Sequence, residues 1–548
     1  MAKPLSTNTP LQRLLQHVQL EKNDIRRLII LTFSIGILSL ATPIAIQALV
    51  NIVTMGGVMQ PLYVVSFMLF LILCLSGSLY VIERYIVELI QRRFFVRTAI
   101  QTAVQAQNAK AEIHDQYNSA ELMNRFFDVI TVQKSAAVLL TYGLSATLQG
   151  IIGSIVLMFY SFYFALVVLI VLLIIFFVVF YLGKFATETA IQESKSKYKV
   201  AAWLEVLARN LITFKFSNGG QFGLNKADLL ADDYLSDRKA HFSTLLYQNI
   251  SGVFIYAFAG TAMLALGGAL VIQGQINLGQ FVAAELIIFS VLFAYRKFVE
   301  YLEYYYDLLA AIDKLGMIDD MPQEAFGQHT LEMHSGIGLK LNNVTFKYLP
   351  HVKLIENLSF SVTPLQQMCL FGGSGAGKST VAELMTGLRY PQHGHIEIND
   401  INIRELNMAQ VRQHIGYAGH IEIIESSIQT NILVGRSDIN MEEISTLLKA
   451  LNLYDTIFTL PNGLETTLTP TGAPFSLQQA KLLMLARALL GHPKLVIIDE
   501  LLDGLDAMHI SKVFDLLQER SNAFTLIVLT NIETIANHFE HRIMLEHV

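Results

Sequence analysis

The run from Cys369 to Met385 reads CLFGGSGAGKSTVAELM and carries four glycines, a lysine and three hydroxyl residues. Gly372, four residues, then Gly377, Lys378 and Ser379 fit the P-loop pattern, after an apolar strand and before an amphipathic helix. Bare glycine backbone can wrap closely around phosphates, and the helix N-terminus adds a partial positive charge. The predicted loop contacts are Gly372, Gly373, Ser374, Gly375, Ala376 and Gly377.

The three residues that follow the loop glycines have separate expected roles. We expect Lys378 to neutralise β- and γ-phosphate oxygens, Ser379 to bind Mg²⁺, and Thr380 to reach the α-phosphate. A second run, LVIIDE at residues 495–500, reads as a buried strand that ends in two carboxylates. A strand ending in solvated acids is common, but beside a P-loop we expect Asp499 to hold Mg²⁺ through water and Glu500 to be the general base. These residues predict ATP and Mg²⁺ as cofactors.

The composition indicates that these residues are joined to a membrane domain. The chain is 53% hydrophobic and 15% charged, against about 25% charged in a globular protein. Three blocks lack Asp, Glu, Lys and Arg, and each is long enough for two spans of about 20 residues. The alternative, buried helices of a soluble protein, fits this distribution poorly. The predicted spans are 28–53, 61–82, 139–159, 163–183, 249–272 and 279–298.

The positively charged residues are expected to lie on one side of the membrane. Lysines and arginines precede the first block and lie between the blocks, whereas the predicted turns near 54–61, 159–163 and 272–278 carry no charge. The positive-inside rule therefore places both termini in the cytoplasm. The N-terminus lacks a signal-peptide cleavage pattern, and no basic run indicates nucleic acid. Cys74 and Cys369 are interpreted as packing residues.

The chain changes character after the spans. Between the blocks, long charged stretches predict that the spanning helices continue into the cytoplasm. Beyond residue 335, strand-like runs alternate with helical ones. We predict a multi-domain membrane protein, in which a six-helix all-α transmembrane domain is fused to an α/β P-loop domain. The predicted domains are 1–26, an N-terminal cytoplasmic amphipathic segment; 27–315, the transmembrane domain; 316–335, a linker; and 336–548, the nucleotide-binding domain.

The order of the spans, the P-loop, ARALLGHPKLVIIDE and LDGLD resembles an exporter-type half-transporter of the ATP-binding cassette (ABC) family. The resemblance covers nearly the whole chain, including MNRFFD at 123–128 and GQINLGQFVAAEL at 274–286. It implies a dimer, homo- or heterodimeric, with two ATP molecules between the soluble domains. It also implies coupling turns, which we place near 117–125 and 211–219. Bacterial exporters of this kind lie in the inner membrane, and some work with a periplasmic adaptor protein.

The resemblance assigns further residues. Tyr348 in VTFKY matches the aromatic that stacks on adenine, although a plain strand aromatic would look the same. Asp506 in LDGLD matches the D-loop acid that contacts the opposite subunit, although it is also a suitable helix N-cap. Ser476 and Gln479 match the retained residues of the signature Leu-Ser-Gly-Gly-Gln, which reaches the partner's γ-phosphate.

Three positions depart from the family pattern. The signature glycines are replaced in the stretch Phe475–Gln479, His420 stands where the family has a Mg²⁺-sensing glutamine, and Asn531 replaces the switch histidine. Asn531 can donate a hydrogen bond but carries no charge. Losing one transition-state donor costs about 10²–10³ in rate. With Glu500, His420 and Asn531 as the catalytic candidates, we expect slow or partner-dependent ATP hydrolysis.

Two functions remain open. The first is a primary active exporter of an unidentified substrate. The second is a non-pumping, ATP-gated membrane regulator or channel, which the altered signature favours more than a standard one would. A P-loop kinase is disfavoured because the membrane domain would have no role. Glu285, inside the sixth predicted span, is either a contact in the translocation path or a structural hydrogen-bonding residue.

Overall fold

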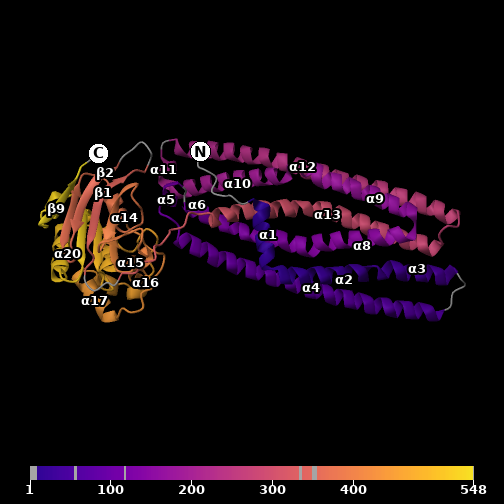
Figure 1. Ribbon diagram of the computed structural model, residues 1–548, viewed down its shortest axis with the longest axis horizontal. Helices are drawn as coiled ribbons and strands as arrows, with labels where there is room; N and C mark the ends of the chain where they lie inside the picture. The colour runs from indigo at the N-terminus through magenta and orange to yellow at the C-terminus, as the bar shows by residue number, and fades with distance from the viewer. Residues whose placement is uncertain are drawn as a thin grey trace. The chain divides into compact units, whose positions relative to one another are not determined.

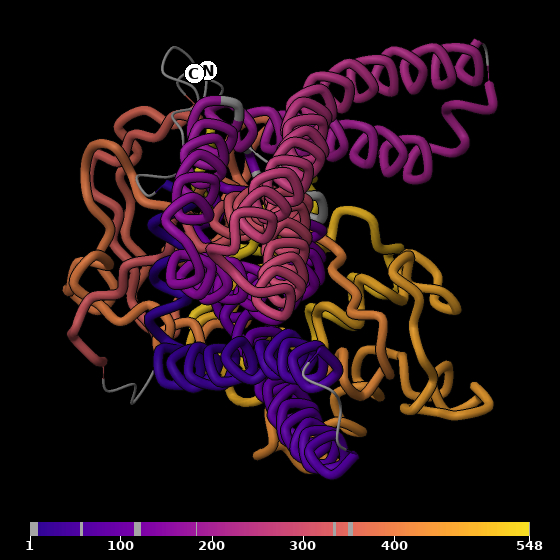
Figure 2. Tube along the Cα trace, turned by 90° about the vertical axis from the view of Figure 1, so that its right-hand side faces the viewer, coloured from indigo at the N-terminus to yellow at the C-terminus, as the bar shows by residue number. Residues whose placement is uncertain are grey.

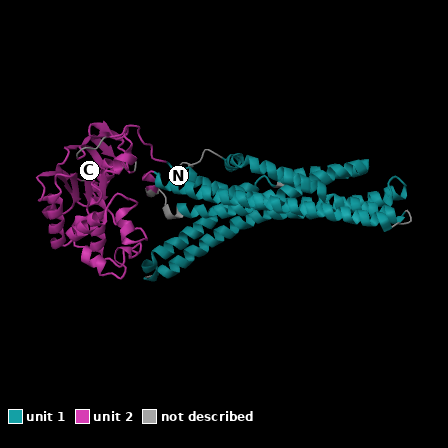
Figure 3. Ribbon diagram, turned by 90° about the horizontal axis from the view of Figure 1, so that it is seen from below, with its two compact units in different colours: residues 1–109, 116–322 teal, residues 110–115, 323–548 magenta. Residues whose placement is uncertain are grey.

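A computed structural model describes residues 9–54, 59–116, 119–216, 218–331, 336–348 and 354–546. Parts of the predicted hairpin turn at 54–61, of both predicted coupling turns and of the predicted linker lie outside these ranges. The chain forms two compact units, coloured separately in Figure 3. The first comprises Met1–Ala109 and Gln116–Pro322, and the second comprises Lys110–Asp115 and Gln323–Val548.

The first unit is helical, as predicted (Figure 1). Within the described residues, six helical stretches are long and apolar enough to cross a membrane: Lys22–Thr54, Met59–Gln107, Leu122–Tyr160, Phe162–Tyr181, Gly219–Ile272 and Leu278–Asp319. Several are much longer than a bilayer requires, because α12 (Gly219–Ile272) has 54 residues and so extends about 80 Å. These lengths agree with the prediction that the spanning helices continue beyond the membrane.

Helix boundaries differ from the predictions in three places. The predicted span 28–53 is divided into α2 (Lys22–Ser39) and α3 (Ala41–Thr54). Pro43 lies in the first turn of α3, where its missing backbone N–H is tolerated. In the interior of one continuous helix from α2 to α3, the same proline would remove a backbone hydrogen bond and interrupt the helix. α9 (Phe162–Phe177) ends in a π-helical turn, Val178–Leu182. α13 (Leu278–Asp319) continues past residue 315, the predicted end of the transmembrane domain.

Small residues bring α8 (Leu144–Tyr160) close to α13. A Cβ atom on Gly153 would lie 2.3 Å from Cγ2 of Val291, and one on Gly150 would lie 2.8 Å from Cε1 of Tyr295. The buried hydroxyls of Ser154 and Tyr295 are 2.8 Å apart and share a hydrogen bond. Helices in lipid associate through such close backbone approach and through polar contacts between helices. Glycine at these positions therefore sets the spacing of the two helices.

α10 (Ala186–Arg209) runs alongside the first half of α12, and the two diverge from the other helices toward α11 (Leu211–Lys215), as Figure 2 shows. Trp203 of α10 closes the far end of this pair. Its indole N–H donates to the carbonyl of Gly223 at 3.0 Å, and its ring packs edge-on against Phe214 and Phe222. The aromatic cluster stabilises the tip that includes the second predicted coupling turn.

The remaining helices of the first unit surround α13. α1 (Pro10–Leu20) begins with a capping box between Thr9 and Gln12. Buried Arg13 of α1 forms an ion pair with Asp320, the residue that follows α13. The other helices are α4 (Met59–Gln107), α6 (Ser119–Asn124), the 3₁₀ turn η1 (Arg125–Phe127), α7 (Asp128–Val138) and the π-helical turn η2 (Leu139–Gly143).

The second unit is α/β and contains two sheets. In the parallel sheet, the strand order is β6 (Ile415–Ala418), β7 (Leu495–Asp499), β8 (Thr525–Thr530), β3 (Gln367–Gly372), β9 (His541–Leu545). The antiparallel sheet has the order β2 (Ile355–Val362), β1 (Leu339–Phe346), β4 (His393–Ile398), β5 (Ile401–Asn402). Except for β5 and β6, these strands agree with the strand-like runs predicted beyond residue 335. β5 and β6 have only two and four residues and were not predicted.

Helices cover the parallel sheet on both faces and connect its strands. The main ones are α14 (Lys378–Met385), α17 (Met441–Ala450), α19 (Leu477–Leu489) and α20 (Ala507–Glu519); shorter ones are α15 (Met408–Arg412), α16 (Ile428–Leu433), α18 (Tyr454–Phe458) and α21 (Glu533–Ala536). All five residues of β7 are buried. In such sheets, ligands bind beyond the carboxyl ends of the strands. β3 and β7 both end at this edge, where their polar residues follow.

The second unit also contains a segment from far upstream in the chain. Lys110–Asp115 belongs to it and includes most of α5 (Glu112–Gln116). Asp115 accepts hydrogen bonds from both terminal nitrogens of Arg389, at 2.6 and 2.9 Å. Such a two-point carboxylate contact fixes orientation as well as distance. The segment is thereby attached to the residues that follow α14.

Candidate nucleotide site

The P-loop connects β3 to α14 and has the geometry of a phosphate-binding loop. Gly375 and Gly377 have φ values of 83° and 87°. Only glycine adopts this left-handed region without strain, so the loop depends on these two positions. Gly377 is the N-cap of α14, which directs the free N–H groups of that helix toward the loop. The structure therefore offers an anion site made of backbone.

Lys378 is the first residue of α14 and its side chain lies inside the loop. The residue is 2% exposed, and Nζ donates to the carbonyls of Gly372 and Gly373 at 2.9 and 2.7 Å. Nζ also lies 2.9 Å from Oε1 of Glu500. The cation is held where phosphate oxygens would meet the loop backbone.

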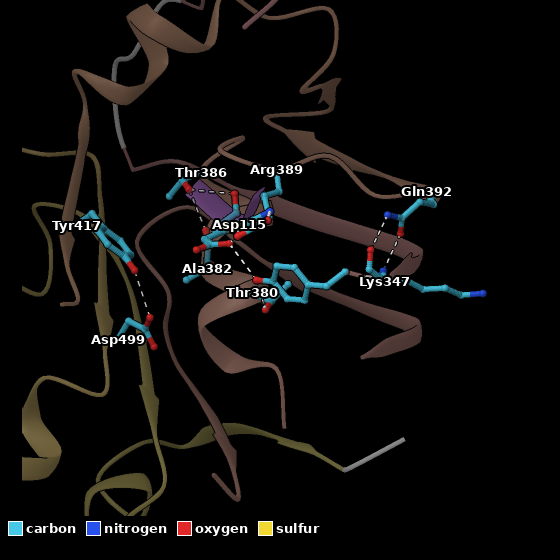
Figure 4. A network of polar contacts seen from close by, with 11 residues as sticks. Asp115, Lys347, Thr380, Ala382, Thr386, Arg389, Gln392, Tyr417 and Asp499 are labelled. Atoms are coloured by element: carbon cyan, nitrogen blue, oxygen red, sulfur yellow. Dashed lines mark hydrogen bonds and ion pairs between the residues drawn. The ribbon is translucent and has the colours of Figure 1, made fainter. Parts of the chain in front are cut away.

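Asp499 lies at the end of β7, directly across from Ser379. Oγ of Ser379 donates to Oδ1 of Asp499 at 3.1 Å, and the hydroxyl of Tyr417 donates to Oδ2 at 3.2 Å. Figure 4 shows the second contact. Burial raises the pKa of Asp499, although both hydrogen bonds act in the opposite direction. A carboxylate and a hydroxyl oxygen are the hard ligands that Mg²⁺ prefers, so these two residues fit the predicted cation.

Glu500 adopts an unusual backbone conformation. Its φ is 53°, in the left-handed region that is uncommon for residues other than glycine, and its N–H donates to the carbonyl of Leu529 at 2.9 Å. Strain of this kind collects at functional sites. The side chain is 40% exposed, so its carboxylate is accessible to solvent beside Lys378. This is the arrangement that a general base for water attack needs.

Asp503 joins the segment after β7 to the end of β8. Its carboxylate accepts hydrogen bonds from the hydroxyl of Thr530 and, at 2.9 Å, from the backbone N–H of Asn531. Burial raises the pKa of Asp503, whereas these two donors lower it. The side chain of Asn531 is exposed. The predicted switch residue is therefore held through its backbone, which leaves its amide free to turn toward a ligand.

Tyr348 follows β1 and lies beside α14. Its hydroxyl shares a hydrogen bond with Thr380 at 3.0 Å, and the guanidinium of Arg389 lies 4.7 Å from the ring centroid. Arg389 also pairs with Glu383 and with Asp115, and the second of these pairs is labelled in Figure 4. One ring face thus contacts a cation, and the residue as a whole is 45% exposed. The arrangement suits a ring that stacks on a base.

The altered signature lies at the N-terminus of α19. Ser476 caps the helix and forms a capping box with Gln479. The Ser476 hydroxyl accepts from the backbone N–H of Gln479, and the Gln479 side-chain oxygen accepts from the backbone N–H of Ser476. Leu477 is 68% exposed, whereas Phe475 is buried. Of the other predicted residues, His420 is exposed in the loop after β6, and Asp506 caps α20 while accepting from His509 at 2.7 Å.

The structure brings together a cluster from distant parts of the sequence. The P-loop, Asp499, Glu500 and Tyr348 are linked by direct contacts through Lys378, Ser379 and Thr380. Sequence reasoning missed Tyr417, because it lies on the short strand β6. It also missed Asp503, although LDGLD contains it, because only Asp506 was interpreted there. These assignments of individual residues remain predictions.

Comparisons with known proteins agree with this architecture. The model of the ABC transporter transmembrane region matches residues 27–295, and the ABC transporter model matches residues 355–503. A protein of Rickettsia bellii, named as an export ATP-binding/permease protein, is 27% identical over 67% of this chain and 65% of its own length. The multidrug efflux ATP-binding/permease protein of Mycobacterium bovis is 29% identical over 53% of this chain and 24% of its own length.

A solved structure shows the same fold. The structure of a bacterial Atm1-family ABC exporter with ATP bound has a TM-score of 0.82, with 17% sequence identity, over 96% of this chain and 94% of that one. The helical unit, the P-loop domain and the family models together define an ABC transporter, and the chain belongs to that family. More narrowly, the six candidate membrane helices among the described residues, joined to an ATP-binding domain, give it the architecture of an exporter-type half-transporter.

Proposed function

We propose that the chain is one subunit of an ATP-driven exporter whose hydrolysis is slow or depends on a partner subunit. The observation that carries the proposal is the contact between Lys378 and Glu500, 2.9 Å apart at the edge of the parallel sheet. This contact supports the proposal, because the cation that is expected to bind phosphate lies beside the candidate base. Ser379 and Asp499 lie next to them and fit Mg²⁺, which would neutralise phosphate charge when bound.

The slow-turnover part of the proposal rests on α19. In the family, glycine backbone at this helix N-terminus approaches the partner's γ-phosphate. Here Leu477, 68% exposed, occupies the first helical position, and Gln478 follows it. Two side chains keep phosphate farther from the N–H groups of the helix. In a homodimer both sites would contain this sequence, whereas a heterodimeric partner with glycines would complete the site built on Lys378 and Glu500.

The test is steady-state phosphate release by the full chain in lipid vesicles with Mg-ATP. We expect a rate well below about 1 per second, and none from Glu500→Gln. A rate of about 1–10 per second that Glu500→Gln abolishes would refute slow turnover in the homodimer. If the rate rises only when a second half-transporter is reconstituted with this chain, the partner-dependent form of the proposal is supported.

A second function is favoured by the same altered signature. A membrane protein that uses ATP occupancy as a switch, without pumping, needs Lys378 and Tyr348 for binding but no efficient hydrolysis. Vesicles separate the two functions. ATP-dependent accumulation of a transported compound against its gradient supports export. ATP-dependent flux that only follows the gradient, and persists in Glu500→Gln, supports the gated function.

A further inference from the structure

A cavity of about 220 Å³ lies in the first unit, between α1 and the helices that it covers. α2, α4, α7, η2 and α13 supply the rest of its lining. The walls are mainly apolar and include Leu14, Ile25, Val87, Phe94 and Leu308. An engineered apolar cavity of about 150 Å³ is sufficient to hold benzene. This cavity therefore has room for part of a hydrocarbon chain.

Two residues of the lining, His17 and Arg97, each have a buried polar atom with unsatisfied hydrogen-bonding capacity. Nδ1 of His17 and Nη2 of Arg97 are buried and have no hydrogen-bond partner among the described residues. The other terminal nitrogen of Arg97 donates to Glu21 at 3.0 Å, and Glu21 also pairs with Arg93 at 3.2 Å. Buried polar groups are normally paired, so two orphan nitrogens on residues that line one cavity are consistent with a missing acceptor.

The charge at this end of the cavity favours an anion. Burial lowers the pKa of His17, and the nearby cations Arg97 and Arg13 lower it further, so the ring is neutral. Its neutral tautomer with the proton on Nδ1 donates one hydrogen bond. Arg97 contributes a permanent positive charge, and the carboxylate of Glu21 is already shared between two arginines. A carboxylate would satisfy both orphan nitrogens.

The two ends of the cavity lie at different depths. Ile25 and Val87 flank the charge-free stretch 28–82, so the apolar end adjoins the membrane-spanning part of α2 and α4. Arg97 is farther along α4 by about 15 Å, at 1.5 Å per residue. A molecule that enters from the cytosolic leaflet would keep its tail toward the bilayer and place its head group at Arg97.

We propose that this cavity binds a single-chain amphiphile with an anionic head, a long-chain fatty acid from the cytosolic leaflet. Its carboxylate accepts hydrogen bonds from Nη2 of Arg97 and Nδ1 of His17, and its chain lies along Ile25 and Val87. The volume holds part of one chain and leaves no room for the two chains of a phospholipid. The site uses residues of the first unit alone, so it stands independently of the proposed ATP-dependent function.

The experiment measures binding of radiolabelled palmitate to the full chain in phosphatidylcholine nanodiscs. We expect saturable binding that Arg97→Gln weakens about tenfold or more, because a charge-assisted contact is lost. Arg93→Gln is the matched control: it also removes a partner of Glu21, but Arg93 is absent from the cavity lining. It should bind palmitate within about twofold of the unmodified chain.

Further arms test the tail and the head. Ala136→Phe places a ring in the cavity and should abolish binding, while unchanged helical content and melting temperature show that the first unit is folded. Palmityl alcohol, which lacks the carboxylate, should compete at least tenfold less well than palmitate. Absence of saturable palmitate binding, equal losses in Arg97→Gln and Arg93→Gln, or better competition by phosphatidic acid than by palmitate would each overturn the proposal.

Discussion

Nζ of Lys378 and Oε1 of Glu500 lie 2.9 Å apart, so the lysine that would bind phosphate is paired with the carboxylate that would activate water. The two side chains differ in exposure, at 1% for Lys378 and 40% for Glu500. Phosphate oxygens that enter the loop must compete with this carboxylate for the same ammonium group. The pair therefore links nucleotide binding to the position of the catalytic candidate.

Glu500→Gln should abolish hydrolysis and at the same time strengthen nucleotide binding. The amide leaves Lys378 without a competing anion, and a partly exposed ion pair is worth about 0.2–1 kcal/mol, which corresponds to up to about fivefold in affinity. Calorimetric titration with a non-hydrolysable ATP analogue measures the change. Lys378→Ala is the control and should lose measurable binding. Weaker binding by Glu500→Gln than by the unmodified chain would show that the pair does not compete with phosphate.

Restoring the signature glycines should raise the hydrolysis rate. In the double variant Leu477→Gly and Gln478→Gly, bare backbone replaces two side chains at the start of α19. The cost is about 1 kcal/mol of helix stability per substitution. We expect a rise of about tenfold or more in the ATPase rate of a homodimer. Leu477→Ala with Gln478→Ala is the matched control, because it shortens the side chains but retains Cβ atoms. If both double variants stay at the original rate, the signature does not limit turnover.

Asp503 is expected to act by holding Asn531. Asp503→Ala removes the acceptor for the Asn531 backbone N–H and for the Thr530 hydroxyl, which belongs to a fully buried residue. An unsatisfied buried group costs about 1–3 kcal/mol, so the melting temperature should fall. We also expect kcat to fall while KM for ATP stays unchanged.

Asp503→Asn separates positioning from charge. Its amide oxygen can still accept from the Asn531 N–H, so it should recover most of the kcat that Asp503→Ala loses. Recovery of the melting temperature without recovery of kcat would mean that the negative charge of Asp503, and not the position of Asn531, matters for turnover.

Mg²⁺-dependent nucleotide affinity should fall as the pH is lowered. The fall should occur at a higher pH than the one at which an unperturbed aspartate is protonated. Burial raises the pKa of Asp499 above its usual value of about 3.9. Metal binding requires the ionised carboxylate, so the Mg²⁺ contribution is complete above the raised pKa and is lost as the pH falls through it. Titrating nucleotide affinity with and without Mg²⁺ from neutral to acidic pH measures this. Asp499→Asn should show a small Mg²⁺ effect that does not change over the same range.

Long, strongly patterned features were predictable from sequence, and short or non-local ones were not. The six spans and the P-loop follow from charge-free blocks and from glycine spacing. β6 has only four residues, IGYA, which is too short for an alternation signal, so Tyr417 and its bond to Asp499 were not predicted. The break between α2 and α3 is signalled in the sequence by Pro43 alone, within an otherwise continuous apolar run.

Contacts between residues far apart in the chain could not be predicted from the sequence either. Asp115 and Arg389 are 274 positions apart, and neither belongs to a motif. The contact between Arg389 and Tyr348 depends on how the segment after α14 folds back over the ring. The capping box at Ser476 and Gln479 was readable in principle, because serine followed three residues later by glutamine is its signature.

The second unit is built from two separate segments of the chain, and this affects the design of an isolated ATP-binding fragment. A fragment that starts at residue 323 would omit Lys110–Asp115 and deprive Arg389, whose side chain is 5% exposed, of its two-point carboxylate ligand. Glu383 would be left to balance that guanidinium. A fragment of the ATP-binding half alone is therefore incomplete, because a short upstream segment of the chain is part of its structure.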